Sequence, residues 1–197
     1  MSRHESRHPS RTRLGLAAAG AAALVGAALL PAASPSAAHD ESPAPTTSAP
    51  TPTEVRRQLN TIRQTHHQYL DPAAAVADGW VPTPECAELP DGSAGMGIHY
   101  INVDRLMAPV DPAKPPILMY APRADGTLRL AGVEWMVPDA DQDLTTDEDR
   151  PSLFGRGFDG PMPGHDPTMP VHYDLHAWIY TPNPDGMFAP FNPLVDC

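Results

Sequence analysis

The most regular alternation of apolar and polar residues lies near the C-terminus, in residues 171–180. Its length and its Val, Tyr, Trp and Ile content predict a β-strand, in which successive side chains point to opposite faces. One predicted face is apolar and the other carries three side chains that can bind a metal ion. The polar face comprises His172, Asp174, His176 and Trp178, and the apolar face comprises Tyr173, Leu175, Ala177 and Ile179.

Shorter apolar runs, broken by Pro, Gly and Asp, predict further strands in the second half of the chain. Asp125-Gly126 is typical of a hairpin turn. Residues 138–170 are too long for a plain connection and are therefore a candidate functional loop. The predicted strands lie near Gly97–Asn102, Ile117–Ala121, Leu128–Val137 and Val171–Thr181.

Helical spacing of apolar residues precedes these runs. Thr53 is a candidate N-cap for a helix that reaches Asp71, and Ala73–Asp78 predicts a short second helix ended by Gly79. A Pro-rich turn holding Cys86 is expected next. Helices followed by strands predict an α+β fold, with one or two N-terminal helices packed on a mainly antiparallel sheet in a single domain of residues 54–197.

The N-terminus has the pattern of a cleavable signal peptide, residues 1–38. A basic start is followed by an uncharged Ala/Leu run over residues 14–30 and by small residues at Ser36-Ala37-Ala38. Residues 39–53 are rich in Pro, Thr and Ser and predict a disordered tether. We therefore expect a secreted protein with no transmembrane anchor after cleavage.

The chain is acidic, with a formal charge of −11 when histidine is neutral. Loss of the four arginines and one glutamate of residues 1–38 leaves 9 basic and 23 acidic side chains, a charge of −14. Such a surface repels phosphate backbones, so a nucleic acid partner is not expected, whereas cations are attracted.

Cys86 and Cys197 are the two cysteines of the chain. Disulfides persist in exported proteins, and two distant thiols are a poor metal motif, so we expect the two to be bonded. Closing so long a loop would stabilise the fold by about 4 to 5 kcal/mol in the chain-entropy estimate.

A mononuclear metal site is the leading chemical hypothesis, built from His99, Glu134 and His176, each at a polar position of a predicted strand. Imidazole and carboxylate ligands suit Zn, Cu, Fe or Mn. Asp174 can be a further ligand or can orient an imidazole as an acceptor. His172 is also a candidate, but four residues of extended strand separate it from His176 by about 13 Å, too far to share one ion unless the strand bends.

Two alternative ions follow from other residues. Met162, His165, Met169 and His172 combine thioethers and imidazoles, which favour Cu(I), and Met96 precedes His99 by three residues.

The acidic run after Val137 suggests calcium. An EF-hand is excluded because Leu144 stands where Gly is needed and Arg150 where Glu is needed. Looser calcium binding through Asp143, Asp147 and Asp149 stays an alternative.

The chain contains the runs GMGIHY, GVEW, DEDRPSLFG, GPMPGH, MPVHYDLHAW and NPDGMFAPFNPLVDC. These runs resemble a group of uncharacterised secreted proteins of actinobacterial type. The resemblance spans most of residues 79–197 and implies domain boundaries, but that family has no established activity and implies no catalytic residue.

No motif in the chain indicates a particular enzymatic reaction. We find no Gly-Xaa-Ser-Xaa-Gly elbow, phosphate-binding loop or dinucleotide fingerprint. The sequence therefore predicts a secreted metal-binding protein, either a metalloenzyme or a metal-handling protein. The alternative is an extracellular binding or structural module whose histidines and acids are surface groups only.

Overall fold

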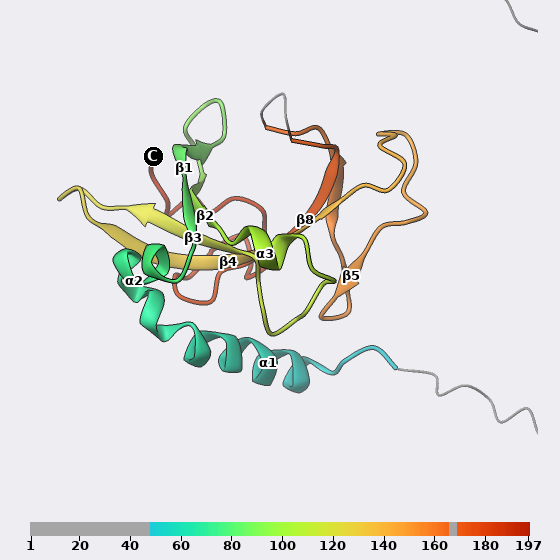
Figure 1. Cartoon of the computed structure of the whole chain (residues 1–197), viewed down its shortest axis with the longest axis horizontal. Helices are drawn as coiled ribbons and strands as arrows, with labels where there is room; N and C mark the ends of the chain where they lie inside the picture. Colours follow the sequence, from blue (N-terminus) through green and yellow to red (C-terminus); the bar gives the residue numbers. More distant parts are fainter. Residues whose placement is uncertain (1–47, 166–168) are drawn as a thin grey trace, which may run out of the picture. The chain divides into compact units, whose positions relative to one another are not determined.

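An antiparallel sheet organises the described part of the chain (Figure 1). The computed structural model describes residues 48–165 and 169–197. The predicted signal peptide and most of the predicted tether lie outside the described residues. None of the described helices has the length and apolar character needed to cross a bilayer.

The main sheet has six strands in the order β1-β2-β3-β4-β8-β7, and a second, two-stranded sheet pairs β5 with β6. All pairings are antiparallel. The helical elements are α1 (Pro52–Thr65), the 3-10 helix η1 (His67–Leu70), α2 (Pro72–Ala77) and α3 (Val103–Leu106). The strands are β1 (Val81–Glu88), β2 (Gly95–Ile101), β3 (Ile117–Pro122), β4 (Leu128–Pro138), β5 (Ser152–Leu153), β6 (Arg156–Gly157), β7 (Asp159–Met162) and β8 (His172–Ala177).

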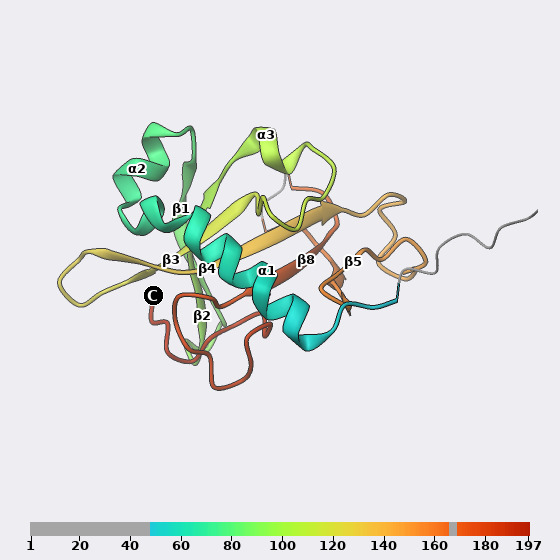
Figure 2. The same ribbon diagram turned by 90° about the horizontal axis from the view of Figure 1, so that it is seen from below.

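Helix α1 crosses one face of the sheet (Figure 2). Its buried residues, Leu59 and Ile62, are one turn apart and belong to the main hydrophobic cluster. Tyr173 and Leu175 of β8 belong to the same cluster, so the apolar face of this strand lies on the helix side. The predicted α+β fold, with N-terminal helices on a mainly antiparallel sheet, is confirmed.

The C-terminal segment is anchored to the sheet at several points. Val195 and Trp178 form a second hydrophobic cluster with Met119 of β3. Cys197 is bonded to Cys86 of β1, with the Cα atoms 5.6 Å apart, which confirms the predicted disulfide. The end of the chain is therefore tied to the opposite edge of the sheet from β7.

Several predicted boundaries were wrong. The N-cap of α1 is Thr51 and not Thr53: its side chain accepts from the Glu54 N–H, and Glu54 reaches back to the Thr51 N–H in a capping box. The first helix ends at Thr65 and continues as a 3-10 turn. The region around Cys86, expected to be a turn, is strand β1, because its irregular register with β2 accommodates the prolines at a sheet edge.

The long segment of residues 138–170 contains strands that the sequence did not indicate. Among them, β7 pairs with β8 and extends the sheet beyond the predicted strand. β8 itself ends at Ala177, four residues earlier than expected, because Trp178 already bonds the C-terminal segment through its N–H to Met187 O.

Candidate metal centre

The structure brings together the three side chains that the sequence singles out for a mononuclear site. His99 lies on β2, Glu134 on β4 and His176 on β8, and one ligand atom of each lies within 4.8 Å of the others. Glu134 is the direct cross-strand partner of His176, so both side chains point to the same face. His99 reaches the pair across the intervening strand β3.

The two imidazoles approach the same carboxylate oxygen. His99 Nε2 lies 3.1 Å from Glu134 Oε2, and His176 Nε2 lies 3.8 Å from that oxygen. These distances bracket the separation of about 3.3 Å expected between two ligands bonded at about 2.05 Å to one tetrahedral Zn²⁺. The geometry is thus of the right size for a shared ion.

The triad is enclosed, which separates it from ordinary polar groups on a solvated sheet face. Side-chain exposure is 0% for His176, 6% for Glu134 and 14% for His99. Both ring nitrogens of His176 and Oε2 of Glu134 are buried without a hydrogen-bond partner. Leaving such groups unsatisfied costs roughly 1 to 3 kcal/mol each, and a bound water molecule or a metal ion would satisfy them.

The protonation states suit metal ligands. Burial opposes ionisation of Glu134, but the imidazoles of His176 and His99 outweigh it and lower the pKa of Glu134 to about 2. Burial lowers the pKa of His176 in spite of the Glu134 carboxylate beside it. Only a protonated ring lowers the pKa of Glu134 through its charge, so the two shifts oppose each other. We take His176 as neutral, because it has no exposed surface and charging it there is costly, and Glu134 as the anion, which the hydrogen bond from His99 favours.

A second group of possible ligands shares His176. Asp159 of β7, Asp174 of β8 and His176 offer ligand atoms that lie within 4.8 Å of one another. His176 Nδ1 is 3.5 Å from Asp174 Oδ1, while its Nε2 faces Glu134. The ring therefore lies between two carboxylates, one on each nitrogen, as in metal centres where an acceptor orients a ligand imidazole.

Asp174 is the most perturbed carboxyl of this group. It is 1% exposed, and burial together with the carboxylates of Glu134 and Asp159 raises its pKa to about 8. A divalent cation nearby would reverse this effect by favouring the ionised form.

The sequence pointed to Asp174 but missed Asp159. Asp159 reaches the cluster because β7 pairs Asp159 with Asp174. The run Asp159-Gly160-Pro161-Met162 lacks the alternation of a strand, so no local signal could have found it.

His172 is buried on the same strand but belongs to neither group of ligands. Its Nδ1 lies 3.1 Å from Pro170 O, and its ring faces that of His165 at a centroid distance of 5.5 Å. The separation of His172 from His176 along an extended strand accounts for this placement.

The carboxylates proposed for loose calcium binding are already engaged within the protein. Asp143 accepts from the N–H and hydroxyl of Thr145, and Asp147 pairs with Arg150 at 3.1 Å. Asp149 accepts from the hydroxyl of Tyr173 and from a backbone N–H. These contacts do not favour the calcium hypothesis.

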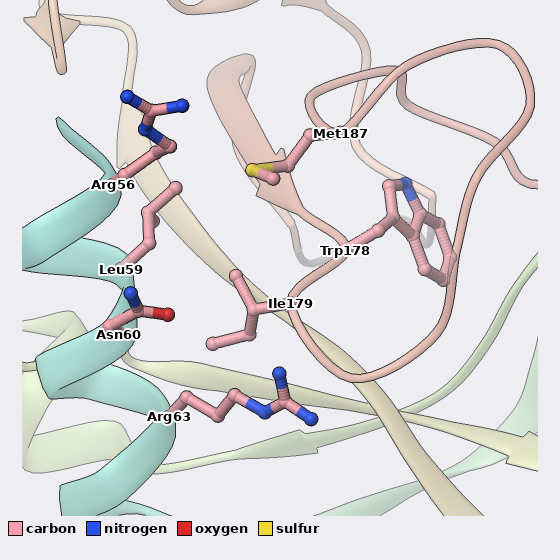
Figure 3. Close-up of a pocket in the computed structure, with 7 residues that line it drawn as sticks. All are labelled: Arg56, Leu59, Asn60, Arg63, Trp178, Ile179 and Met187. Atoms are coloured by element: carbon pink, nitrogen blue, oxygen red, sulfur yellow. The ribbon is translucent and has the colours of Figure 1, made fainter. Parts of the chain in front are cut away.

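A cavity of about 180 Å³ lies between α1 and the segment that follows β8 (Figure 3). None of the candidate ligands lines it, so it is separate from the triad. The residues that line it are Arg56, Leu59, Asn60, Arg63, Trp178, Ile179 and Met187.

Comparison with known proteins gives no relative from which a role could be transferred: no protein family, no curated protein and no solved structure matches this chain.

Proposed function

We propose that this is an exported metal-binding protein whose His99, Glu134 and His176 side chains hold one divalent ion. The observation that carries the proposal is the set of buried ligand atoms without hydrogen-bond partners on Glu134 and His176, which lie with a ligand atom of His99 within 4.8 Å of one another. A bound ion would satisfy Glu134 Oε2 and one ring nitrogen of His176 together, while Asp174 faces the other ring nitrogen at 3.5 Å.

Zn²⁺ is the ion that the donor set favours most. Two neutral imidazoles and one carboxylate form a borderline set that Zn²⁺ accepts in tetrahedral geometry, and Asp174 would orient His176 through Nδ1. Cu, Fe and Mn accept the same donors, so the metal's identity is part of the test. The low pKa of Glu134 and the neutral His176 let both bind without losing a proton, whereas Asp174 would release its proton as the ion favours the ionised form.

The enclosure of the triad supports retention of an ion more than turnover of a substrate. His176 and Glu134 are almost fully buried, and the cavity beside α1 is lined by none of the three ligands. A second candidate function, a metalloenzyme, is supported by the three-ligand set itself, which leaves a fourth position for water, and by the partial exposure of His99.

Export is supported by the disulfide between Cys86 and Cys197, a bond that persists outside reducing compartments. The signal-peptide pattern and the resemblance to secreted actinobacterial-type proteins are consistent with the same location. Both are proposals that rest on the sequence.

The test is metal analysis of untagged protein recovered from its secretion route, because a histidine tag would itself bind metal. We expect about one equivalent of Zn²⁺ or a similar ion per chain. Glu134→Gln preserves side-chain shape and should lower affinity about 100-fold or more, since even outer partners of a ligand are worth about 10- to 100-fold. His67→Ala, at an exposed histidine, is the matched control and should keep the metal.

Folding is checked by circular dichroism for each variant. Stoichiometric metal retained unchanged by a folded Glu134→Gln or His176→Ala protein would refute the proposed centre. Hydrolysis of ester, amide or phosphate test substrates that is lost on metal removal would decide for the enzymatic alternative.

A further inference from the structure

A second set of possible metal ligands flanks the connection between β7 and β8. We call it the Met/His cluster. It combines two thioethers and two imidazoles within a short stretch of chain and shares no residue with the triad. Its members are Met162, His165, Met169 and His172.

The fold brings the two ends of this stretch together. Met162 is the last residue of β7 and is the cross-strand partner of His172, the first residue of β8. Partners in an antiparallel pair point to the same face, so this thioether and this imidazole are neighbours. The ring of His165 then lies 5.5 Å from that of His172, centroid to centroid.

The fourth member closes the cluster. The backbone N–H of His165 donates to Met169 Sδ at 3.4 Å, which leaves the second lone pair of the sulfur available. Gly164 permits this close approach, because a Cβ at that position would lie 2.7 Å from both C and Cβ of Met169. The chain is therefore shaped to bring Met169 against His165.

His172 is held in the tautomer that a metal ligand requires. Its Nδ1 lies 3.1 Å from Pro170 O, and because a carbonyl only accepts, Nδ1 carries the proton. Nε2 of His172 then presents a lone pair. A hydrogen bond from the other ring nitrogen to a backbone carbonyl is the usual arrangement in histidine ligands.

Methionines usually fill the hydrophobic core, but Met162 and Met169 do not lie in it. Met119 does fill the core, as a fully buried member of a hydrophobic cluster. Met162 and Met169 are only half-buried and belong to neither hydrophobic cluster of the described residues. Exposure decreases from His165 at the surface to the buried His172, so an ion can enter from solvent.

We infer that the Met/His cluster is a Cu(I) site. Thioether and imidazole donors together select soft monovalent copper over the harder ions suited to a carboxylate-containing triad. The acidic chain attracts cations, which favours capture. This site does not rest on the proposed function, because none of its four members belongs to the triad and no side chain of the triad is needed.

The experiment is an anaerobic Cu(I) competition titration of the untagged mature protein with bicinchoninate as the probe and ascorbate as reductant, which spares the disulfide. We expect about one equivalent bound, with sulfur scatterers next to copper in the X-ray absorption spectrum. Met162→Leu/Met169→Leu keeps the side-chain volume and should weaken Cu(I) binding about tenfold or more.

Three further variants sharpen the result. Met107→Leu/Met187→Leu replaces two exposed methionines, 77% and 44% exposed, and should bind Cu(I) as the unaltered protein does. His165→Ala changes an exposed side chain that the fold does not need, so it should lose affinity without loss of structure. Glu134→Gln should retain Cu(I), which separates this site from the triad.

Cu(I) affinity unchanged in both the Met162→Leu/Met169→Leu and His165→Ala proteins would overturn the assignment. A copper spectrum without sulfur scatterers, or Cu(I) binding lost in a folded Glu134→Gln protein, would also overturn it, because the ion would then lie at the triad.

Discussion

At the scale of single residues, the properties of the candidate metal centre depend on a few buried, ionisable side chains that shift one another's pKa values. His176 has a carboxylate near each ring nitrogen, Glu134 at 3.8 Å and Asp174 at 3.5 Å. The pKa of Glu134 is lowered, and the hydrogen bond from His99 favours its anion, whereas burial raises the pKa of Asp174 to about 8. Two carboxyl groups on one sheet face thus have opposite protonation at neutral pH in the absence of a cation.

Asp174 predicts a pH dependence of stability that an ion should remove. Its pKa rises from an ordinary 3.8 to about 8 on folding, so between these values the unfolded chain releases a proton that the native state keeps. Stability therefore falls as pH rises through this window. Relative to Asp174→Asn, the metal-free protein should lose on the order of 1 to 3 kcal/mol between pH 4 and pH 8.

Melting temperatures in EDTA, measured for both proteins across this range, check the prediction. Taking the difference between them cancels the other titrating groups. Excess Zn²⁺ should abolish the pH-dependent difference, since a nearby cation favours the ionised carboxyl. A difference that stays constant from pH 4 to pH 8 without metal would contradict the assigned shift.

At the scale of elements, the register of the sheet assembles the triad. Pairing of Glu134 with His176 follows from β4–β8 register, and His99 is opposite Met119 on β3. Met119 is in turn paired with Gly132. A change of register by one residue on any of these strands would move its ligand to the helix-covered face.

Gly132 is the position where this assembly is most sensitive to added volume. A Cβ there would lie 2.6 Å from Met119 Cε and 2.8 Å from Ala177 O, next to His176. Gly132→Ala should therefore destabilise the fold by about 1 to 3 kcal/mol and weaken metal binding through displacement of β8. Gly126→Ala has no such neighbour but has positive φ, so it serves to separate backbone strain from crowding.

Chemical denaturation and metal titration of both glycine variants are the measurements. Gly126→Ala should lose stability while its metal affinity is kept. Equal metal affinity in Gly132→Ala and the unaltered protein would show that β8 does not need this close approach.

Helix α1 offers a clean comparison of two threonines. Thr51 makes the capping box with Glu54, whereas Thr53 is the second residue of the helix and its hydroxyl accepts from Arg56. Thr51→Ala should cost about 1 kcal/mol, and Thr53→Ala should be close to neutral. Urea denaturation of the two variants measures these changes in the free energy of unfolding. A larger loss of stability in Thr53→Ala than in Thr51→Ala would indicate that Thr53 is the N-cap.

At the scale of the whole described domain, the C-terminal segment that follows β8 links this strand to β1 and β2 near the other edge of the sheet. The disulfide joins Cys197 to β1, and Asn192 bridges Gly95 of β2. Val195 packs beside Met119, the cross-strand partner of His99. The segment therefore supports the strand that carries His99.

Removal of the disulfide should loosen this support. Cys86→Ala/Cys197→Ala is expected to lower the free energy of unfolding by about 2 to 5 kcal/mol, because the unfolded chain gains the entropy of an open loop. Thermal denaturation with and without reductant measures the effect. Reductant should lower the melting temperature of the unaltered protein and leave that of the double variant unchanged. Equal melting temperatures of the two proteins without reductant would contradict a stabilising bond.

The sequence by itself determined the class of the fold and which side chains are the main candidate ligands. Helical spacing of Leu59 and Ile62, followed by short apolar runs, was sufficient for an α+β domain because burial of one face dictates these periods. Period-two alternation likewise placed Asp174 and His176 on one face. The disulfide bond between Cys86 and Cys197 was predicted because the chain has only two cysteines and the N-terminus has the pattern of an export signal.

The tertiary structure decided what local pattern does not contain. Strand β1 contains prolines that are typical of a turn, and it is defined only by its pairing with β2. Strand β7 has no alternation of apolar and polar residues, and it is defined only by its pairing with β8. Three further features depend on contacts between residues that are distant in the sequence. These are the burial of the polar face, the approach of His99 to the triad across β3, and the approach of Asp159 to Asp174. They depend on strand order and register, and a period read along one strand cannot specify which other strand lies beside it.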